Sequence, residues 1–341
     1  MKAFWDPAQL THTPRFFLQR GTLRPNFETP ARATALLAAC RAMGMDIFAP
    51  QKIERGALTA VHRPAYLDFL RDGPAAWGAL PEHGPEMVAN IHPSPEMLAN
   101  GARPSADIVG KVGWFTADTS CPVTADTWPA ALAAASGAVA AADEAAQGRH
   151  AYALARPPGH HAYRARAGGH CYLNNAAIAA ERLRARGAAR VGVLDIDSHH
   201  GNGTQGVFWE RDDVAFASVH GDPGGYYPWY VGHARERGGG AGIGHNHNLP
   251  LPRGSGDNAW LEAVAHALRL LGPVDALVVS LGFDASADEP LNFLSVTADG
   301  FARAGEIVGG AGKPAAIVQE GGYNTEMMGG LLQQFMIGMV G

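Results

Sequence analysis

The chain has few cysteines, little charge and no long apolar run, and each shortage excludes a class of protein. Its three cysteines, Cys40, Cys121 and Cys171, are scattered, so they form neither a disulfide framework nor a paired-cysteine metal motif. No stretch approaches the length and uniform apolarity of a membrane span. The net charge is −5 without a long basic run, which argues against a nucleic-acid partner.

The amino terminus also lacks an apolar segment, because Lys2 and Pro7 interrupt it, so we expect no signal peptide and a cytoplasmic location. With 341 residues, of which 47% are hydrophobic and 17% charged, the chain can bury a large core. No repeat, linker or domain boundary is visible. We therefore predict one catalytic domain over residues 1–341.

Apolar segments and helical patterns occur along the whole chain, and they alternate regularly in its second half. Strands are predicted at 151–155, 190–195, 214–219, 274–281 and 315–319, and helices at 31–43, 64–70, 126–147, 174–186, 257–271 and 297–309. This alternation predicts an α/β fold with a parallel sheet covered by helices on both faces.

Residues 73–122 differ from the rest, with prolines at 74, 81, 85, 93, 95 and 104. We predict a long, irregular excursion, which in a compact domain is usually functional or disordered.

Ionisable side chains follow the predicted strand at 190–195. Asp195, Asp197, His199 and His200 stand where a parallel sheet places its ligand crevice, beyond the carboxyl ends of its strands. Because side chains alternate along a strand, the first three share one face and His200 points to the other. Asp197 and His199 supply an oxygen and a nitrogen ligand, a pair suited to Zn²⁺ or Fe²⁺.

Three other strand ends also deliver reactive groups. His160 and His161 follow a rigid Pro-Pro-Gly turn and suit acid–base work near neutral pH. Asp284 could be a third metal ligand or only a helix cap. Tyr323 follows two glycines and could donate a hydrogen bond to an oxyanion or simply pack.

Taken together, these segments resemble the motifs of the histone deacetylase family, including its bacterial acetylpolyamine amidohydrolase branch. The matching motifs are RPPGHHA at 156–162, GGHCYLNN at 168–175, DIDSHHGNG at 195–203, SVH at 218–220, SLGFD at 280–284 and EGGY at 320–323. The resemblance covers nearly the whole chain, beginning weakly around Arg32 and His62. It implies an arginase-like α/β domain around an eight-stranded parallel sheet.

The resemblance also implies a role for each residue of the site. Asp197, His199 and Asp284 would hold one catalytic Zn²⁺, with Fe²⁺ as the alternative ion. The implied catalytic groups are the general base and acid His161, its partner Asn202, the electrostatic partner His160, the carboxylate Asp195 that supports His160, and Tyr323, which would polarise the carbonyl.

Structural potassium is implied near the zinc. The matching positions are Asp195, Asp197, His199, Ser218 and Val219. A second, more remote monovalent site would involve Phe208, Arg211 and Val214, where His245 replaces a common aromatic residue.

The substrate tunnel is expected to contain Gly169 and His170, faced by the aromatic wall Tyr226 and Tyr227 and by Leu291 at the rim. His170 stands where many relatives carry Phe or Tyr, which would make the tunnel more polar and pH-sensitive. By the same resemblance, residues 73–122 would form a homodimer interface and an acidic entrance. Its candidate carboxylates are Glu82, Glu86, Glu96, Asp107 and Asp118, although Val109 stands where polyamine enzymes would have Glu.

We therefore predict a zinc-dependent amidohydrolase that deacetylates a small N-acetylated amine, most directly an acetylpolyamine. A protein acetyl-lysine deacetylase and an amidase for another small amide remain alternatives. An arginase-like ureohydrolase would need two metals and an Asp-x-Asp pair. Here Ser286, two residues after Asp284, stands where the second Asp of that pair would be. A binding protein without chemistry would not need the intact set of Asp197, His161 and Tyr323.

Overall fold

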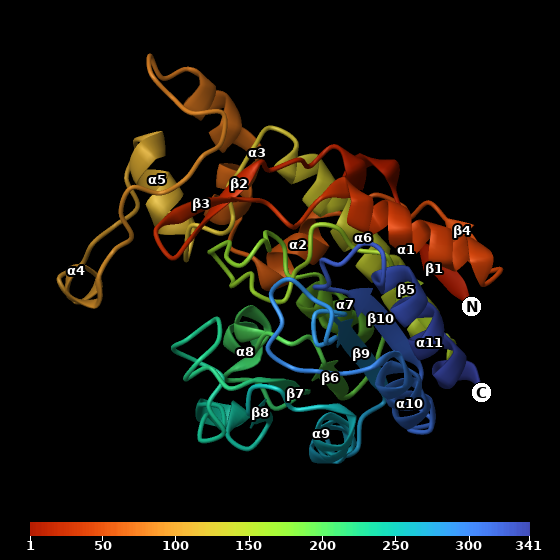
Figure 1. Cartoon of the computed structure of the whole chain (residues 1–341). Helices are drawn as coiled ribbons and strands as arrows, with labels where there is room; N and C mark the ends of the chain where they lie inside the picture. Colours follow the sequence, from red (N-terminus) through yellow and green to blue (C-terminus); the bar gives the residue numbers. More distant parts are fainter.

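The computed structural model describes residues 1–341 and contains an eight-stranded parallel sheet in the order β4-β1-β5-β10-β9-β6-β7-β8 (Figure 1). The predicted α/β fold class is therefore confirmed. The strands are β1 (Lys2–Phe4), β4 (Asp46–Phe48), β5 (Ala151–Ala153), β6 (Val191–Asp195), β7 (Val214–Gly221), β8 (Asn246–Leu251), β9 (Ala276–Leu281) and β10 (Ala315–Gln319).

Helices cover both faces of the sheet, because successive strand side chains point to opposite sides. On β9, Val278 belongs to the core beneath α6 (Thr127–Ala145) and α7 (Asn175–Ala185). Its neighbours Leu277 and Val279 belong to the other core, beneath α1 (Pro30–Ala42), α9 (Asp257–Leu270), α10 (Ala298–Gly309) and α11 (Met328–Val340). None of the helices is both long and apolar enough to cross a membrane.

The predicted helices and central strands are present, but the edge strands and several short helices were not predicted. β1 and β4 have three residues each, too few for a periodic pattern. β8 is the strand NHNLPL, whose polar residues and Pro250 are unlike a buried strand and are tolerated at the sheet edge. The unpredicted helices include α2 (Arg55–Val61), α8 (Asn202–Phe208) and α11.

The prediction that residues 73–122 are irregular is partly wrong. The helix begun at Pro64 continues past Pro74 as α3 (Pro64–Gly78), and α4 (Pro95–Ala99) and α5 (Ile108–Phe115) follow. α5 orders because Val112 and Phe115 are buried in the core with Phe69 of α3. The chain around α4 extends away from the sheet in Figure 1.

A separate antiparallel hairpin precedes α1. It pairs β2 (Phe16–Gln19) with β3 (Thr22–Pro25) through the two-residue turn Arg20-Gly21. Both turn residues have positive φ, 50° and 73°, as expected for the turn type that matches strand twist in short hairpins.

Glycines let α10 and α11 pack closely, which generates a stability prediction. A Cβ at Gly305 of α10 would lie 2.1 Å from the carbonyl oxygen of Phe335 on α11, so the helices would have to separate. Gly305→Ala should lower the free energy of unfolding by about 1–3 kcal/mol in a urea titration. The control Gly330→Ala, which meets no atom within 4 Å, should be neutral or stabilising. Equal effects of both substitutions would contradict the packing explanation.

Candidate active site

The reactive side chains meet because their strands are neighbours in the sheet. β5, β10, β9 and β6 are consecutive in the strand order, and the loops that follow them carry His160, Tyr323, Asp284 and Asp197. In a parallel sheet these loops leave at the same edge. Segments separated by more than a hundred residues therefore supply one site.

Three donor side chains converge at the centre of this edge. His199 Nδ1 lies 3.2 Å from Asp197 Oδ1 and 2.9 Å from Asp284 Oδ2, and all three residues are buried. Backbone N–H groups donate to the carboxylates, from Gly321 to Asp197 Oδ2 at 2.7 Å and from Ser198 to Asp284 Oδ1 at 2.9 Å. Two carboxylates and one imidazole within 4.8 Å of one another form a donor set that suits a divalent metal ion.

Glycine is required beside this donor set. A Cβ at Gly321 would lie 2.4 Å from Asp284 Oδ2 and 2.6 Å from Asp197 Oδ2. Any side chain there would displace the carboxylates, which explains one glycine of the EGGY motif.

A second buried group of possible donors, His160, Cys171 and Glu320, is less suited to a metal. Glu320 Oε2 accepts hydrogen bonds from the backbone N–H groups of Gly159 and His160, at 2.6 and 3.0 Å. Burial raises the pKa of the Cys171 thiol well above its ordinary value, so the thiolate that a metal needs is disfavoured.

The tandem histidines have different partners. His160 Nδ1 lies 3.1 Å from Asp195 Oδ2, whereas His161 Nδ1 lies 2.6 Å from Asn202 Oδ1. Asn202 Nδ2 donates to the hydroxyl of Tyr163 at 2.8 Å, which orients the amide so that its oxygen faces His161. With the Nδ1 proton of His161 directed at Asn202, Nε2 is the ring nitrogen left free to accept a proton.

The electrostatic surroundings of the two imidazoles also differ. Burial disfavours a charged His160, but the carboxylates of Asp197 and Asp195 outweigh burial and raise its pKa to about 10. Burial, with the neighbouring His160 and His199, lowers the pKa of His161 well below its ordinary value. The carboxylates thus favour a charged His160, whereas burial and the neighbouring imidazoles favour a neutral His161.

Two groups position Tyr323: one contacts its backbone and the other lies over one face of its ring. Glu289 Oε2 accepts from the N–H of Tyr323 at 2.8 Å, and the guanidinium of Arg32 lies 5.0 Å from the ring centroid. Arg32 is itself buried, bonds the carbonyls of Glu320 and Gly322, and pairs with Glu28 at 2.8 Å. Glu28 and Glu289 were missed from the sequence, because neither lies in a motif.

A cavity of about 530 Å³ leads from the surface to His161, His199 and Tyr323. All five predicted substrate-binding residues line it: Gly169, His170, Tyr226, Tyr227 and Leu291. Tyr226 stacks on His199, with ring centroids 4.4 Å apart, and donates to the carbonyl of Leu291 at 2.8 Å. Burial lowers the pKa of His170 to about 4, which favours a neutral ring at pH 7, so the expected pH sensitivity of the tunnel stays a prediction.

Within the single chain, none of the five candidate carboxylates of the expected acidic entrance lines the cavity, so an acidic entrance formed with a second chain stays a prediction. Glu86 is buried and accepts from the backbone N–H of Arg15 at 2.8 Å. Asp118 lies behind the wall, where it accepts from Tyr227 Oη at 2.6 Å and from the Gly169 N–H at 3.0 Å. The β2–β3 hairpin, which carries no motif, lines the cavity together with Ser120 of residues 73–122.

The predicted potassium positions lie beside the metal ligands. The sheet register pairs Asp195 of β6 with Ser218 of β7, and Val219 follows, all fully buried. Ser218 Oγ lies 2.8 Å from His220 Nδ1. At the remote position, Arg211 pairs with Asp213 and Glu181, while His245 contacts Arg190 at 2.7 Å.

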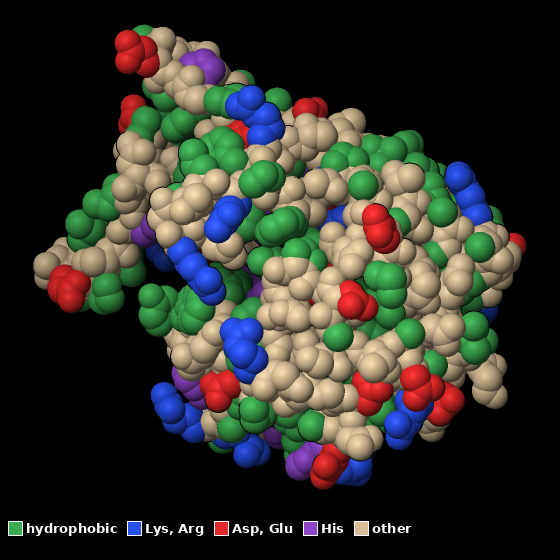
Figure 2. Space-filling model, viewed as in Figure 1, with side chains coloured by type: hydrophobic (Ala, Val, Ile, Leu, Met, Phe, Trp, Pro, Cys, Tyr) green, Lys and Arg blue, Asp and Glu red, His purple; other side chains and the backbone are tan.

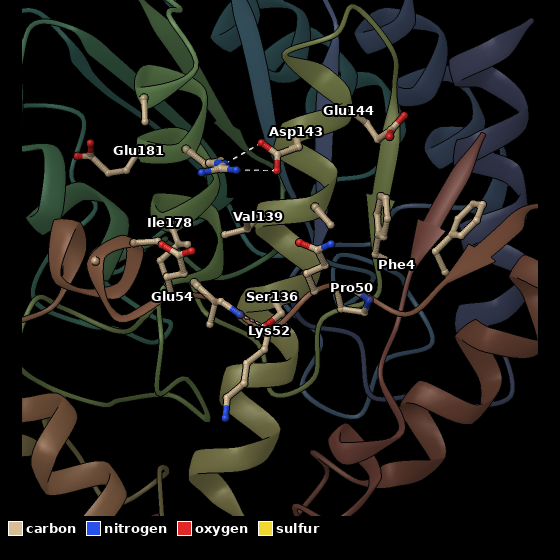
Figure 3. Close-up of a pocket in the computed structure, with 18 of the residues that line it drawn as sticks. Phe4, Pro50, Lys52, Glu54, Ser136, Val139, Asp143, Glu144, Ile178 and Glu181 are labelled. Atoms are coloured by element: carbon tan, nitrogen blue, oxygen red, sulfur yellow. Dashed lines mark hydrogen bonds and ion pairs between the residues drawn. The ribbon is translucent and has the colours of Figure 1, made fainter.

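A larger cavity, about 620 Å³, lies between α6, α7 and residues 48–57 (Figure 3). It contains none of the predicted site residues, and four of its charged groups pair with one another. Asp143 pairs with Arg182 at 2.7 Å, and Glu144 pairs with Lys2 at 2.8 Å.

A buried Asp–His–Asp donor set beside paired imidazoles and a phenol defines a metal-dependent hydrolase. Residues 26–339 match the Histone deacetylase domain family. The chain belongs to this family of metal-dependent deacetylases and is a hydrolase acting on amide bonds.

Its relatives include acetylpolyamine amidohydrolases. The chain is 45% identical to the Acetylpolyamine amidohydrolase of Burkholderia pseudomallei over 96% of this chain and 95% of that protein. It is 38% identical to the Acetylpolyamine amidohydrolase of Mycoplana ramosa over 95% of both chains. The crystal structure of acetylpolyamine aminohydrolase from Burkholderia pseudomallei superimposes with a TM-score of 0.94, 45% identity and coverage of 99% and 98%.

The donor set generates a prediction about metal content. Purified protein should bind about one catalytic divalent ion per chain, and Asp197→Ala should lose both the metal and activity, because it removes one of three ligands. Elemental analysis after dialysis measures this. The control Asp212→Ala, at an exposed position, should retain the metal. Two equivalents of catalytic metal would contradict a mononuclear site and favour the ureohydrolase alternative.

Proposed function

We propose that the protein is a zinc-dependent deacetylase that hydrolyses a small N-acetylated amine, most directly an acetylpolyamine. The observation that carries the proposal is the Asp–His–Asp set at the base of a cavity that also exposes His161 and Tyr323. The relatives named acetylpolyamine amidohydrolase support this substrate class.

Asp197, His199 and Asp284 would hold the zinc, although the same donor set accepts Fe²⁺. When bound, the ion would supply a Lewis acid that lowers the pKa of water and polarises the acetyl carbonyl. Backbone N–H groups immobilise these carboxylates, because they donate to both oxygens of Asp197 and to one oxygen of Asp284.

The chain's own residues would move the protons. His161 Nε2 would take a proton from the attacking water and deliver it to the leaving amine, while Asn202 keeps the ring in that tautomer. His160, bonded to Asp195, would remain charged and stabilise negative charge in the transition state. Tyr323 would donate its hydroxyl proton in a hydrogen bond to the carbonyl oxygen as that oxygen becomes negative.

A structural potassium ion would occupy Asp195, Asp197, His199, Ser218 and Val219. The support is a run of buried oxygen donors on the paired strand ends β6 and β7. The remote site at Phe208, Arg211 and Val214 has weaker support, because Arg211 is a cation already paired there.

A protein acetyl-lysine deacetylase is the second candidate, since the Tyr226–Tyr227 wall would also fit an acetyl-lysine side chain. Acetate release from N-acetylputrescine, N-acetylcadaverine, acetylspermidine and acetyl-lysine peptides separates the two. The proposal expects the small amines to have the higher kcat/KM. A preference for peptides would favour the second candidate.

In that assay, His161→Ala and Tyr323→Phe should each remove most activity while the metal stays bound. Losing a positioned base costs about 10²–10⁴-fold, and losing an oxyanion donor costs about 10²–10³-fold. Tyr230→Phe is the matched control, because Tyr230 is 87% exposed. Near-normal kcat in both active-site variants would remove these residues from the mechanism.

We also propose a homodimer built on residues 73–122. The support is a set of apolar side chains exposed on this segment, Ile91, Met97 and Leu98, which are 61%, 45% and 44% exposed. Met97→Asp with Leu98→Asp should raise the dimer dissociation constant at least about tenfold, since charges would be buried without partners. Sedimentation equilibrium measures it, with Ile243→Asp, exposed but outside the segment, as the control. An unchanged dimer or a monomeric wild type would contradict this interface.

A further inference from the structure

The charged side chains at the mouth of the active-site cavity are all arginines. Arg20, Arg24 and Arg253 line the cavity, and no aspartate or glutamate does. Figure 2 shows basic side chains around a hollow on this face of the molecule. We call these three residues the arginine rim.

The β2–β3 hairpin aims two members of the rim at the cavity. Arg24 is directly opposite Phe17 in the hairpin register, so the two side chains lie on the same face. Phe17 is buried against His170, with ring centroids 5.5 Å apart, which fixes that face toward the site. Arg20 occupies the tight turn at the end of the same hairpin.

Arg253 approaches from the other side of the mouth, after β8. Its guanidinium lies 4.2 Å from the ring centroid of Phe293, which packs against the wall residue Tyr226 at 4.5 Å. It makes one side-chain hydrogen bond, from Nη1 to the carbonyl of Asn292 at 3.4 Å. Stacking of this kind orients a guanidinium while leaving most of its five donors free.

The rim arginines have no carboxylate partner in the chain, unlike several arginines elsewhere on the surface. Arg149 pairs with Glu144 and Arg182 with Asp143, both at 2.7 Å. Unpaired guanidinium groups on two sides of a concave mouth create a positive potential there, and planar guanidinium donors match the geometry of a carboxylate.

We propose that the arginine rim binds a carboxylate at the far end of the substrate, so that the enzyme prefers Nω-acetylated diamino acids to acetylated polycations. This inference rests on the proposed deacetylase function: it keeps the small N-acetylated amine of that proposal but favours an acetylated diamino acid over the acetylpolyamine. A carboxylate at the mouth gains charge-assisted hydrogen bonds, whereas the extra ammonium groups of a long polyamine meet like charges. Nε-acetyl-L-lysine and N-acetylcadaverine are a matched pair, because they differ only in the α-carboxylate.

The test compares kcat/KM for this pair and for N1-acetylspermine, using the metal-loaded full chain. Wild type should favour Nε-acetyl-L-lysine over N-acetylcadaverine, and N1-acetylspermine should be the poorest and improve as salt rises. Replacing the rim, Arg20→Gln with Arg24→Gln and Arg253→Gln, should lower the first ratio about tenfold, mainly through KM. Arg24→Glu should improve N1-acetylspermine. The control Arg303→Gln, on the exposed side of α10, should change nothing.

The possible failures are distinguishable. Equal kcat/KM values for Nε-acetyl-L-lysine and N-acetylcadaverine would overturn the inference and leave the deacetylase proposal standing. The same holds if the rim variant and Arg303→Gln change the ratio of these two values by the same factor. Loss of the dimer in the rim variant with an unchanged ratio would assign the arginines to a protein interface and also overturn it. Hydrolysis of none of the three substrates by protein with its metal bound would overturn both proposals.

Discussion

The burial of four carboxylates at one edge of the sheet is the constraint on which the rest of the site depends. Asp195, Asp197, Asp284 and Glu320 are all without solvent exposure, and such charges are very unfavourable in a protein interior unless they are compensated. Backbone N–H groups donate to each of them, and imidazoles lie against three. Burial and the neighbouring charge of Asp197 raise the pKa of Asp284, and a bound cation would offset both effects. One requirement, the compensation of buried negative charge, thus accounts for the metal dependence, the glycines of EGGY and the tandem histidines.

A second charged network extends from this centre to the amino-terminal segment. Buried Glu28 lies between Arg32 and Arg156, at 2.8 Å from each. Arg32 bonds the carbonyls of the Glu320–Gly322 loop and stacks on Tyr323, while Glu289 holds the N–H of Tyr323 from the other direction. The phenol is therefore placed by two segments, around Arg32 and Glu289, that are far apart in sequence. A conservative substitution that removes the carboxylate of Glu28 or Glu289 would affect catalysis by displacing Tyr323, since neither carboxylate lines the cavity.

The central strands and the reactive loops could be predicted because their physics is local. Buried parallel strands are continuous apolar runs, and each such run here ends in ionisable residues, so sequence order alone placed Asp197, His199 and Asp284 at one edge. The edge strand β8 could not be predicted, because half of its side chains are polar and two of them, Asn246 and Asn248, are satisfied by Gln205, which lies about 40 residues earlier in the chain. The helix through Pro74 was missed for a related reason, since burial of Phe69 and Leu70 outweighs the helix-breaking tendency of the proline.

The mouth of the cavity was the least predictable part, and this has a physical cause. Reaction chemistry needs fixed distances, so it resides at strand ends that the sheet holds rigidly. Charge selection at a mouth needs only a potential, which exposed side chains on a hairpin or loop can supply without a fixed sequence pattern. Arg20 and Arg24 lie on the hairpin and Arg253 follows an edge strand, outside every motif shared with the family. Relatives 45% identical over almost the whole chain can therefore share the hydrolytic machinery and still differ in the charge of the substrate they accept. The family match therefore supports the reaction more directly than the substrate, and the proposed role of the arginine rim concerns the substrate.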